Sequence, residues 1–180
     1  MPGEEPSAHV ERVALQKART VGDTGEIVLA ADTIVVVDGA ILGKPRDRSD
    51  ARRMLELIQG REHHVLSGVA LREVGDGGRP STGREATTVE ESKVRLRPLD
   101  GAEIEWYVGT GEPADKAGAY ALQGIGGLFV ERVEGSSSNV IGLPLHVVYE
   151  LFRRLGLDLR DFRHDVRPGP PRPIDTLPRS

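Results

Sequence analysis

The sequence predicts a single α/β domain in which a twisted, mixed sheet is flanked by helices. Stretches with the period of an amphipathic helix alternate with apolar, β-branched stretches of strand length. The length of 180 residues is enough for one domain with a sizeable core. We expect this domain over residues 1–156, because residues 157–180 are rich in Pro and Arg, lack an apolar period and read as a disordered tail.

The first two elements are expected to be a helix and a buried strand. Residues 6–21 fit a helix, since Pro6 suits a first turn and apolar residues up to Val21 recur on one face. Residues 27–37 are apolar almost throughout and rich in β-branched side chains. This composition is typical of a central strand that is covered on both faces.

A tight turn should follow that strand. Asp38 and Gly39 are a two-residue hairpin signal, so residues 40–43 should return antiparallel. The hairpin would bring Lys44 back toward the level of Asp32. Opposite charges are therefore expected near one another at one end of the sheet.

The rest of the domain continues the alternation of helices and strands. A helix at about 49–59 has Asp47 or Ser49 as its cap. Asp100 and Glu103 match a capping box at the start of a short helix. The other expected elements are strands at 64–74 and 85–98 joined by a glycine-rich connection, a strand at 128–133, a turn at 135–139, and a helix at 144–156 with Leu145, Val148, Tyr149, Phe152 and Leu155 on one face.

Composition excludes several classes of function. The net charge of −4 argues against nucleic acid as a partner, because binding to phosphate backbones needs clustered Lys and Arg. The chain has no cysteine, which rules out disulfides and thiolate metal ligands and fits a cytoplasmic protein. Neither a signal peptide nor a membrane-spanning stretch is recognisable, so no membrane partner is expected.

Two stretches combine acids, lysines and permissive glycines, as phosphate sites require. The first runs from Ala30-Ala31-Asp32-Thr33 to Gly43-Lys44-Pro45, and the second is the run Glu112-Pro113-Ala114-Asp115-Lys116-Ala117-Gly118-Ala119-Tyr120-Ala121-Leu122-Gln123-Gly124. The charged residues of each stretch can also be interpreted without a functional role. Asp32 could be a turn or capping aspartate, and Lys44 a solvated charge. Asp115 and Lys116 could form a surface ion pair of little energetic worth.

Together the two stretches resemble the Maf family of nucleoside triphosphate pyrophosphatases, in order and spacing, from about Ala14 to Gly156. The resemblance implies a Maf or inosine triphosphatase-like fold with a nucleotide cleft. It implies hydrolysis of dTTP, UTP and modified pyrimidine nucleotides to the monophosphate and pyrophosphate. Proteins of this family are often homodimers, so a homodimer is an expected assembly.

The resemblance also assigns roles to residues. Asp32 matches the proton acceptor that activates water, and as a carboxylate it could also hold the divalent cation, Mg²⁺ or Mn²⁺. The positions that match substrate-binding residues are Thr33, Lys44, Asp115, Lys116 and Gln123.

Thr33 and Gln123 fit the subgroup that acts on dTTP and UTP. The Gln123 amide offers one acceptor and two donors, so it can pair with the N3–H and O4 of uracil or thymine. Cytosine presents the reverse pattern at that edge. Without the family context, an exposed loop glutamine would be the favoured reading of Gln123.

Three other features carry less weight. His63 and His64 are adjacent, so on a strand they would point to opposite faces rather than share a metal. The serine-rich turn at 136–139 could reach a ligand or could simply lead into a helix. Lys93 could line the cleft or be solvated.

One family feature is missing from the sequence. Maf proteins open with a strand and a Ser-x-Ser-Pro-Arg-Arg loop, and nothing like that loop is present. We therefore expect an N-terminally truncated domain with an exposed strand edge. The alternative function is a catalytically impaired, Maf-like nucleotide-binding or regulatory protein. A generic metal-dependent phosphohydrolase outside the family is disfavoured by the paired motifs.

Overall fold

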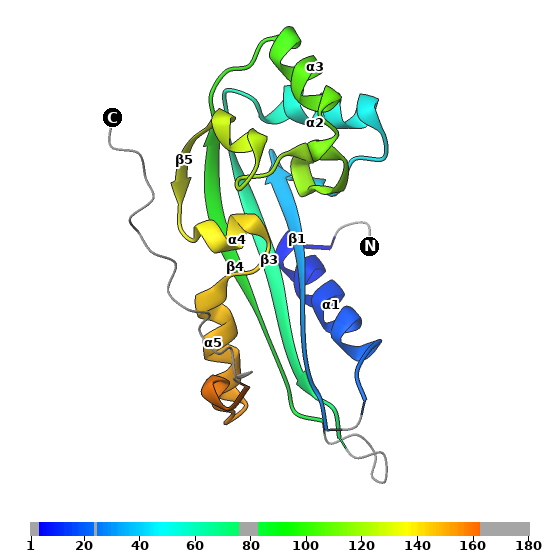
Figure 1. The fold of residues 1–180 in the computed structure, drawn as a ribbon, viewed down its shortest axis with the longest axis vertical. Helices are drawn as coiled ribbons and strands as arrows, with labels where there is room; N and C mark the ends of the chain where they lie inside the picture. Colours follow the sequence, from blue (N-terminus) through cyan, green and yellow to red (C-terminus); the bar gives the residue numbers. More distant parts are fainter. Residues whose placement is uncertain (1–3, 24, 76–82, 163–180) are drawn as a thin grey trace, which may run out of the picture.

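The computed structural model describes residues 4–23, 25–75 and 83–162, and its backbone is organised around one five-stranded sheet (Figure 1). The strand order is β2-β1-β3-β4-β5. The strands are β1 (Ile27–Val37), β2 (Ala40–Leu42), β3 (Glu62–Glu73), β4 (Glu85–Leu96) and β5 (Val130–Glu134).

Every pair of neighbouring strands in this sheet is antiparallel, so the expectation of a mixed sheet is wrong for the described residues. The reason lies in the crossover that carries the helix α2 (Arg48–Ile58). It joins β2 to β3, and these two strands run parallel because both are antiparallel to β1. Since β1 lies between them, no two parallel strands are hydrogen-bonded.

The predicted hairpin is confirmed. Val37 pairs with Ala40, which leaves Asp38 and Gly39 as the two turn residues. Both have positive φ, 49° and 76°, as a two-residue turn of the primed type requires.

β1 was expected to be central, and it does lie between β2 and β3, but one of its edges is largely open. β2 pairs only with residues 35–37 of β1. Along 27–34, the side of β1 away from β3 has no strand partner among the described residues. In the part of the chain that the structure describes, the expected exposed strand edge is therefore present.

One face of the sheet is covered by α1 (Pro6–Arg19), which contacts β1 and β3 through Val10, Ala14 and Ala18. A Cβ at Gly68 of β3 would collide with the Val10 carbonyl, so glycine is needed for this close approach. The helix ends two residues before the expected boundary, and Val21 is exposed.

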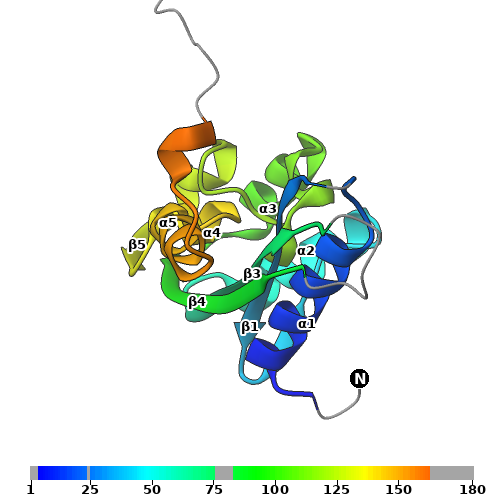
Figure 2. The same cartoon turned by 90° about the horizontal axis from the view of Figure 1, so that it is seen from below.

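The opposite face is covered by α4 (Ser137–Ile141) and α5 (Leu145–Arg154), as the view along the sheet shows (Figure 2). The apolar face assigned to the last helix is partly wrong, because Leu145 and Tyr149 are exposed. The side chains of α5 that pack on β3 and β4 are Val147, Val148, Leu151 and Phe152. α4 takes the place of part of the expected turn.

The helices α2 and α3 (Gly101–Gly109) pack together beyond one end of the sheet (Figure 1). Asp47 caps α2 by accepting a hydrogen bond from the Asp50 amide, which decides between the two expected caps. The capping box of Asp100 and Glu103 is confirmed at the start of α3. This end of the molecule contains the largest group of packed apolar side chains.

The segment between α3 and β5 forms three short 3-10 helices: η1 (Glu112–Asp115), η2 (Ala117–Ala119) and η3 (Ile125–Phe129). The strand expected at 128–133 begins at Val130 instead, because Leu128 belongs to η3 and is exposed.

The segment after α5 is described only to residue 162. The short η4 (Leu159–Phe162) sets the Phe162 ring edge-on to Phe152, with centroids 5.4 Å apart. The rest of the expected tail, 163–180, and most of the glycine-rich connection, 76–82, lie outside the described residues. Among the described residues, no helix combines the length and apolar character needed to cross a membrane.

Candidate functional site

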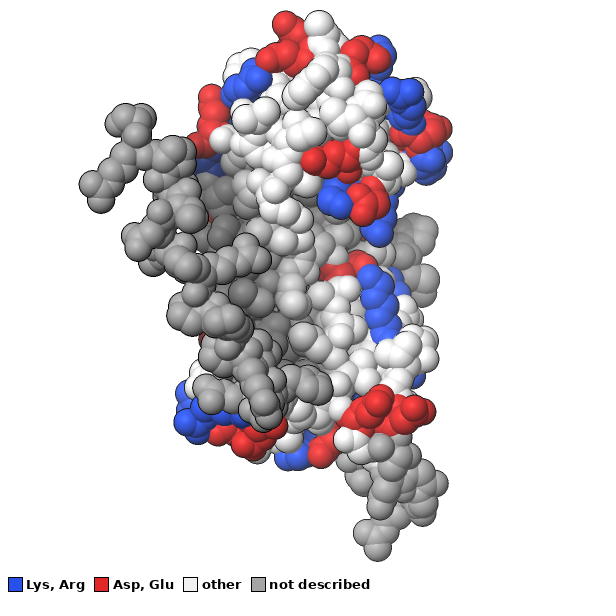
Figure 3. All heavy atoms as spheres, viewed as in Figure 1, with Lys and Arg blue, Asp and Glu red and all other residues white. Residues whose placement is uncertain are grey.

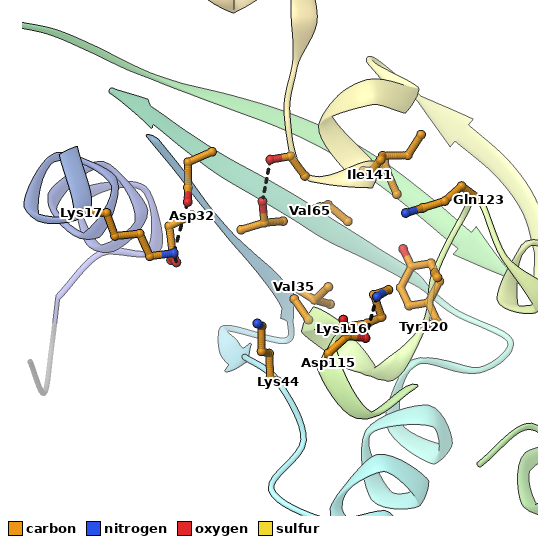
Figure 4. A pocket seen from close by; sticks show the side chains of 16 residues that line it. Lys17, Asp32, Val35, Lys44, Val65, Asp115, Lys116, Tyr120, Gln123 and Ile141 are labelled. Carbon is orange, nitrogen blue, oxygen red and sulfur yellow. Dashed lines mark hydrogen bonds and ion pairs between the residues drawn. The ribbon is translucent and has the colours of Figure 1, made fainter. Parts of the chain in front are cut away.

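A cleft of about 180 Å³ opens at the free edge of β1. It is formed by segments that are distant in the sequence: α1, β1, the end of the hairpin, the 115–123 segment and α4 (Figure 4). The predicted residues Asp32, Thr33, Lys44, Asp115, Lys116 and Gln123 all line it.

Asp32 lies within β1 and is paired with Lys17 of α1. The Lys17 ammonium donates to Asp32 Oδ1 at 2.7 Å and to the Ala31 carbonyl at 3.2 Å. The Asp32 side chain is 19% exposed and that of Lys17 is 52% exposed, so the pair lies at the rim of the cleft. The other carboxylate oxygen, Oδ2, has no hydrogen-bond partner among the described residues.

Lys17 is a site residue that the sequence reasoning missed. Its only sequence signal is its place beside the buried helix positions Ala14 and Ala18. The pairing depends on α1 lying across the face of β1 to which Asp32 points.

Thr33 points to the opposite face of the sheet from Asp32, as neighbours on a strand must. Its hydroxyl shares a hydrogen bond of 2.7 Å with Ser67 and contacts the Gly142 carbonyl at 3.5 Å. The cleft therefore extends around the edge of β1, with α1 on one side and the end of α4 on the other.

Lys44 reaches the cleft because the hairpin returns the chain alongside β1, as the turn predicted. The amide of Gly118 donates to the Gly43 carbonyl at 3.1 Å, which ties the end of the hairpin to η2. Lys44 is exposed, and its ammonium has no hydrogen-bond or ion-pair partner among the described residues.

Asp115 and Lys116 form an ion pair of 2.5 Å. The Lys116 ammonium, helped by Lys44 at longer range, lowers the pKa of Asp115 below its usual value. From the sequence, this pair could be a surface ion pair or a contact to a ligand. Asp115 is exposed, and Lys116 is half-buried in the cleft wall.

Gln123 lies across the cleft from the Asp32 and Lys17 pair (Figure 4). It is exposed, and its amide has no hydrogen-bond partner in the described part of the chain. Its donors and acceptor are free to bind a ligand.

Tyr120 forms part of the cleft wall below Gln123 and is held from behind by His63. The His63 Nε2 and the Tyr120 hydroxyl are 2.9 Å apart, and His63 is fully buried. Burial, with a smaller effect of the neighbouring His64, lowers the pKa of His63 to about 4. His64 points to the other face and contacts Glu91, so the expected opposite orientation of the two histidines is confirmed.

The remaining weaker candidates lie away from the chemistry. Lys93 does not line the cleft and lies 3.8 Å from Glu62. Ser136 caps α4 by accepting from the Asn139 amide, so the serine-rich turn leads into a helix.

The cleft combines three lysines with two carboxylates, which leaves one net positive charge to attract an anion: Lys17, Lys44, Lys116, Asp32 and Asp115. The molecular face in Figure 3 otherwise carries acidic and basic side chains intermixed. On this face, the net positive charge of the cleft gives a local attraction for an anion.

The carboxylates of the cleft, Asp32 and Asp115, could bind a divalent cation only together with other ligands. Among the described residues, no group of three or more His, Asp or Glu side chains could hold a metal ion by itself. Mg²⁺ is usually bound by one or two carboxylates together with substrate phosphates and water. Asp32, with one oxygen unpaired, fits that kind of site.

The fold and the cleft define the class of the protein: an α/β protein with a lysine-rich cleft at the open edge of its sheet. A profile of the Maf-like protein family matches residues 1–155, and the chain belongs to the Maf family. The family resemblance inferred from the motifs is thus confirmed.

Several relatives carry the name dTTP/UTP pyrophosphatase. The relative in Anaeromyxobacter sp. (strain Fw109-5) is 57% identical over 86% of this chain and 73% of its own length. Those in Symbiobacterium thermophilum and Myxococcus xanthus (strain DK1622) are both 48% identical, over 85% and 87% of this chain and 76% of their own lengths.

Proposed function

We propose that this protein hydrolyses dTTP and UTP to the nucleoside monophosphate and pyrophosphate. The observation that carries the proposal is the cleft, which brings two carboxylates, three lysines and an exposed side-chain amide together from separate segments. Family membership and relatives named for this activity support it.

Asp32 is the proposed general base. Its unpaired oxygen can accept a proton from a water molecule whose oxygen attacks the α-phosphorus. The bond from that phosphorus to the bridging oxygen breaks, and the bridging oxygen leaves with pyrophosphate. Lys17 holds the carboxylate in place at 2.7 Å, which restricts its orientation toward the water.

The lysines are the proposed phosphate contacts. Phosphoryl transfer depends chiefly on positioned cations, because charge is spread over the phosphate oxygens in the transition state. Lys44 has no competing partner among the described residues, so its ammonium can turn fully to the phosphates. Lys116 is preorganised by Asp115 at 2.5 Å.

Asp32 is also the proposed ligand of a divalent cation, Mg²⁺ or Mn²⁺. When bound, such a cation supplies charge neutralisation at the phosphate oxygens. The carboxylate and the substrate phosphates together match the usual coordination of Mg²⁺.

Gln123 is the proposed reader of the base. Its amide can donate to O4 and accept from N3–H of uracil or thymine. Its place across the cleft from Asp32 separates the base from the reacting phosphate (Figure 4). Thr33, whose hydroxyl is engaged by Ser67, fixes the strand at the centre of the cleft.

A substrate panel tests the proposal. Pyrophosphate release should be faster from dTTP and UTP than from CTP, ATP or GTP. Asp32→Asn should lower kcat by roughly 10² to 10⁴ while leaving the melting temperature close to that of the native protein, because the change removes basicity but keeps the shape.

Asp38→Asn is the matched control. Asp38 is an exposed turn residue outside the cleft, and Asn tolerates its positive φ, so activity should be retained. A preference for purines, or an unchanged kcat in well-folded Asp32→Asn, would contradict the proposal. Nucleotide binding without pyrophosphate release would favour the non-catalytic alternative.

A further inference from the structure

The position of Gln123 is set by its backbone, because its side chain has no hydrogen-bond partner among the described residues. Gln123 lies in the segment 121–126, which leads from the end of η2 into the first residues of η3 and which we call the 121–126 turn. How this turn is fixed therefore decides where the amide points.

One side of the turn is fixed by Glu112. Its carboxylate accepts hydrogen bonds from two consecutive backbone amides, those of Ile125 and Gly126, each at 2.9 Å. Glu112 belongs to η1, which packs against α3. The amides that follow Gln123 are thus tied to the helical end of the molecule.

The other side of the turn is fixed by Tyr107. Its hydroxyl accepts a hydrogen bond from the Ala121 amide at 3.2 Å and donates one to Glu112 at 2.7 Å. Tyr107 is fully buried in α3, and its ring packs edge-on against Phe129 with centroids 5.1 Å apart. We call the Tyr107 hydroxyl and the Glu112 carboxylate the Tyr107–Glu112 anchor.

The turn is shaped to fit this anchor. A Cβ at Gly126 would lie 2.5 Å from the Tyr107 hydroxyl, and one at Gly124 would collide with the Glu112 carboxylate. The backbone on the C-terminal side of Gln123 therefore approaches the anchor more closely than any other residue type would allow.

Protonation favours the same arrangement. Burial and the Glu112 carboxylate raise the pKa of Tyr107, so its hydroxyl remains a donor. Burial alone would raise the pKa of Glu112. Hydrogen bonds from the Gly126 amide, the Tyr107 hydroxyl and the Ile125 amide together outweigh burial, so the pKa of Glu112 lies below its usual value. A charged acceptor thus faces only donors in this group.

We infer that the Tyr107–Glu112 anchor positions Gln123 for selection of the base, an inference that rests on the proposed function. Tyr107 and Glu112 are positioning residues, since they do not line the cleft. They act on the substrate through the two sides of the turn that carries Gln123.

Glu112→Gln and Tyr107→Phe test the inference. The glutamine NH₂ would face a backbone N–H in place of an acceptor oxygen, and the phenylalanine removes the hydroxyl. Each variant should lower the ratio of kcat/KM for UTP to that for CTP by about three- to tenfold, mainly through a higher KM for UTP.

Glu103→Gln is the matched control. Its carboxylate also accepts a side-chain and a backbone hydrogen bond at α3, from Arg97 and Asp100, but it does not contact the 121–126 turn. It should lower the melting temperature without changing the UTP to CTP ratio.

A double-mutant cycle separates positioning from general destabilisation. If Glu112 acts through Gln123, Glu112→Gln should add no further loss of selectivity to Gln123→Ala. Additive losses, or an unchanged ratio in Glu112→Gln, would overturn the inference. An unchanged ratio in Gln123→Ala would overturn it as well, since Gln123 would then not read the base.

Hydrogen exchange of the nucleotide-free protein gives a readout that does not depend on activity. The Ile125 and Gly126 amides should exchange at least about tenfold faster in Glu112→Gln than in the native protein, while amides of α1 stay unchanged. Unchanged exchange at the two amides would overturn the inference even if UTP is a substrate. Faster exchange in a protein that does not hydrolyse UTP would place the failure in the proposed function.

Discussion

Lys17 shows how much of the site depends on a single long-range contact. It lies on α1, yet its ammonium is 2.7 Å from the carboxylate of Asp32 on β1. No local sequence pattern around Lys17 predicts this ion pair, because the pair forms only when α1 packs across the sheet. The predicted acid was found from its motif, and its partner was not.

Replacing Lys17 by Met should keep the apolar stem and remove the charge. The phosphates would lose one cation and Asp32 its orienting partner, so kcat/KM should fall at least on the order of tenfold. The fall should be equal for UTP, dTTP and CTP, since Lys17 lies at the opposite end of the cleft from Gln123.

Steady-state pyrophosphate release measures this effect. Lys93→Met is the control, because Lys93 is a partly exposed lysine outside the cleft. Native activity in Lys17→Met, or a loss confined to one base, would show that Lys17 has a different role.

His63 makes the stability of the fold depend on pH. The pKa of His63 is about 4 in the folded protein, against 6.5 for an ordinary histidine. Between these values the unfolded chain binds a proton that the folded state does not, so the free energy of unfolding decreases as the pH falls. The contribution of His63 to this loss should be about 2 kcal/mol between pH 6.5 and 4.5.

Urea unfolding at the two pH values, with His63→Gln and His64→Gln as a pair, isolates this effect. His63→Gln should be less stable at pH 6.5 but should lose less stability on acidification than the native protein. His64→Gln should lose nearly as much as the native protein, because burial, the larger cause of the low pKa of His63, remains in this variant. Equal losses in all three proteins would refute this account of His63.

At the scale of elements, the sequence predicted those features that local chemistry determines. The Asp38-Gly39 turn and the Asp100–Glu103 capping box depend on residues a few positions apart, and both are present. The same hairpin placed Lys44 in the cleft with Asp32. The motif residues of the candidate site were predicted because they lie in two short stretches, while their supporting residues are scattered along the chain.

The features that the sequence did not predict depend on packing between distant elements. The antiparallel neighbours arise because β1 separates the parallel strands β2 and β3, which no local pattern encodes. The buried side of α5 includes Val147 and Leu151 rather than Leu145 and Tyr149, since the apolar residues surround much of the helix and only the sheet selects a face.

At the scale of the whole molecule, the open edge of β1 should influence self-association. Along residues 27–34, one side of β1 has no strand partner among the described residues, although the Ala31 carbonyl accepts a hydrogen bond from Lys17. Such edges are templates for pairing between chains. Leu29, which is 38% exposed, lies on this segment.

Leu29→Lys should reduce concentration-dependent association, because a charge on an edge strand disfavours pairing with another chain. Sedimentation velocity over a range of protein concentrations measures this. Leu128→Lys is the matched control, since it replaces an exposed leucine outside the sheet. Equal association of the native protein and Leu29→Lys would show that the edge is not the contact.

The extension of the cleft around the edge of β1 also bears on how the family could diversify. In the function proposed above, hydrolysis would depend on Lys17 and Asp32, which lie on the α1 side, and recognition of the base on the 121–126 turn across the cleft. Because different elements supply the two halves, a descendant could exchange one nucleobase for another through substitutions in one short turn. Lys17 and Asp32 would stay unchanged in such a descendant, so a change of substrate would need only a few substitutions.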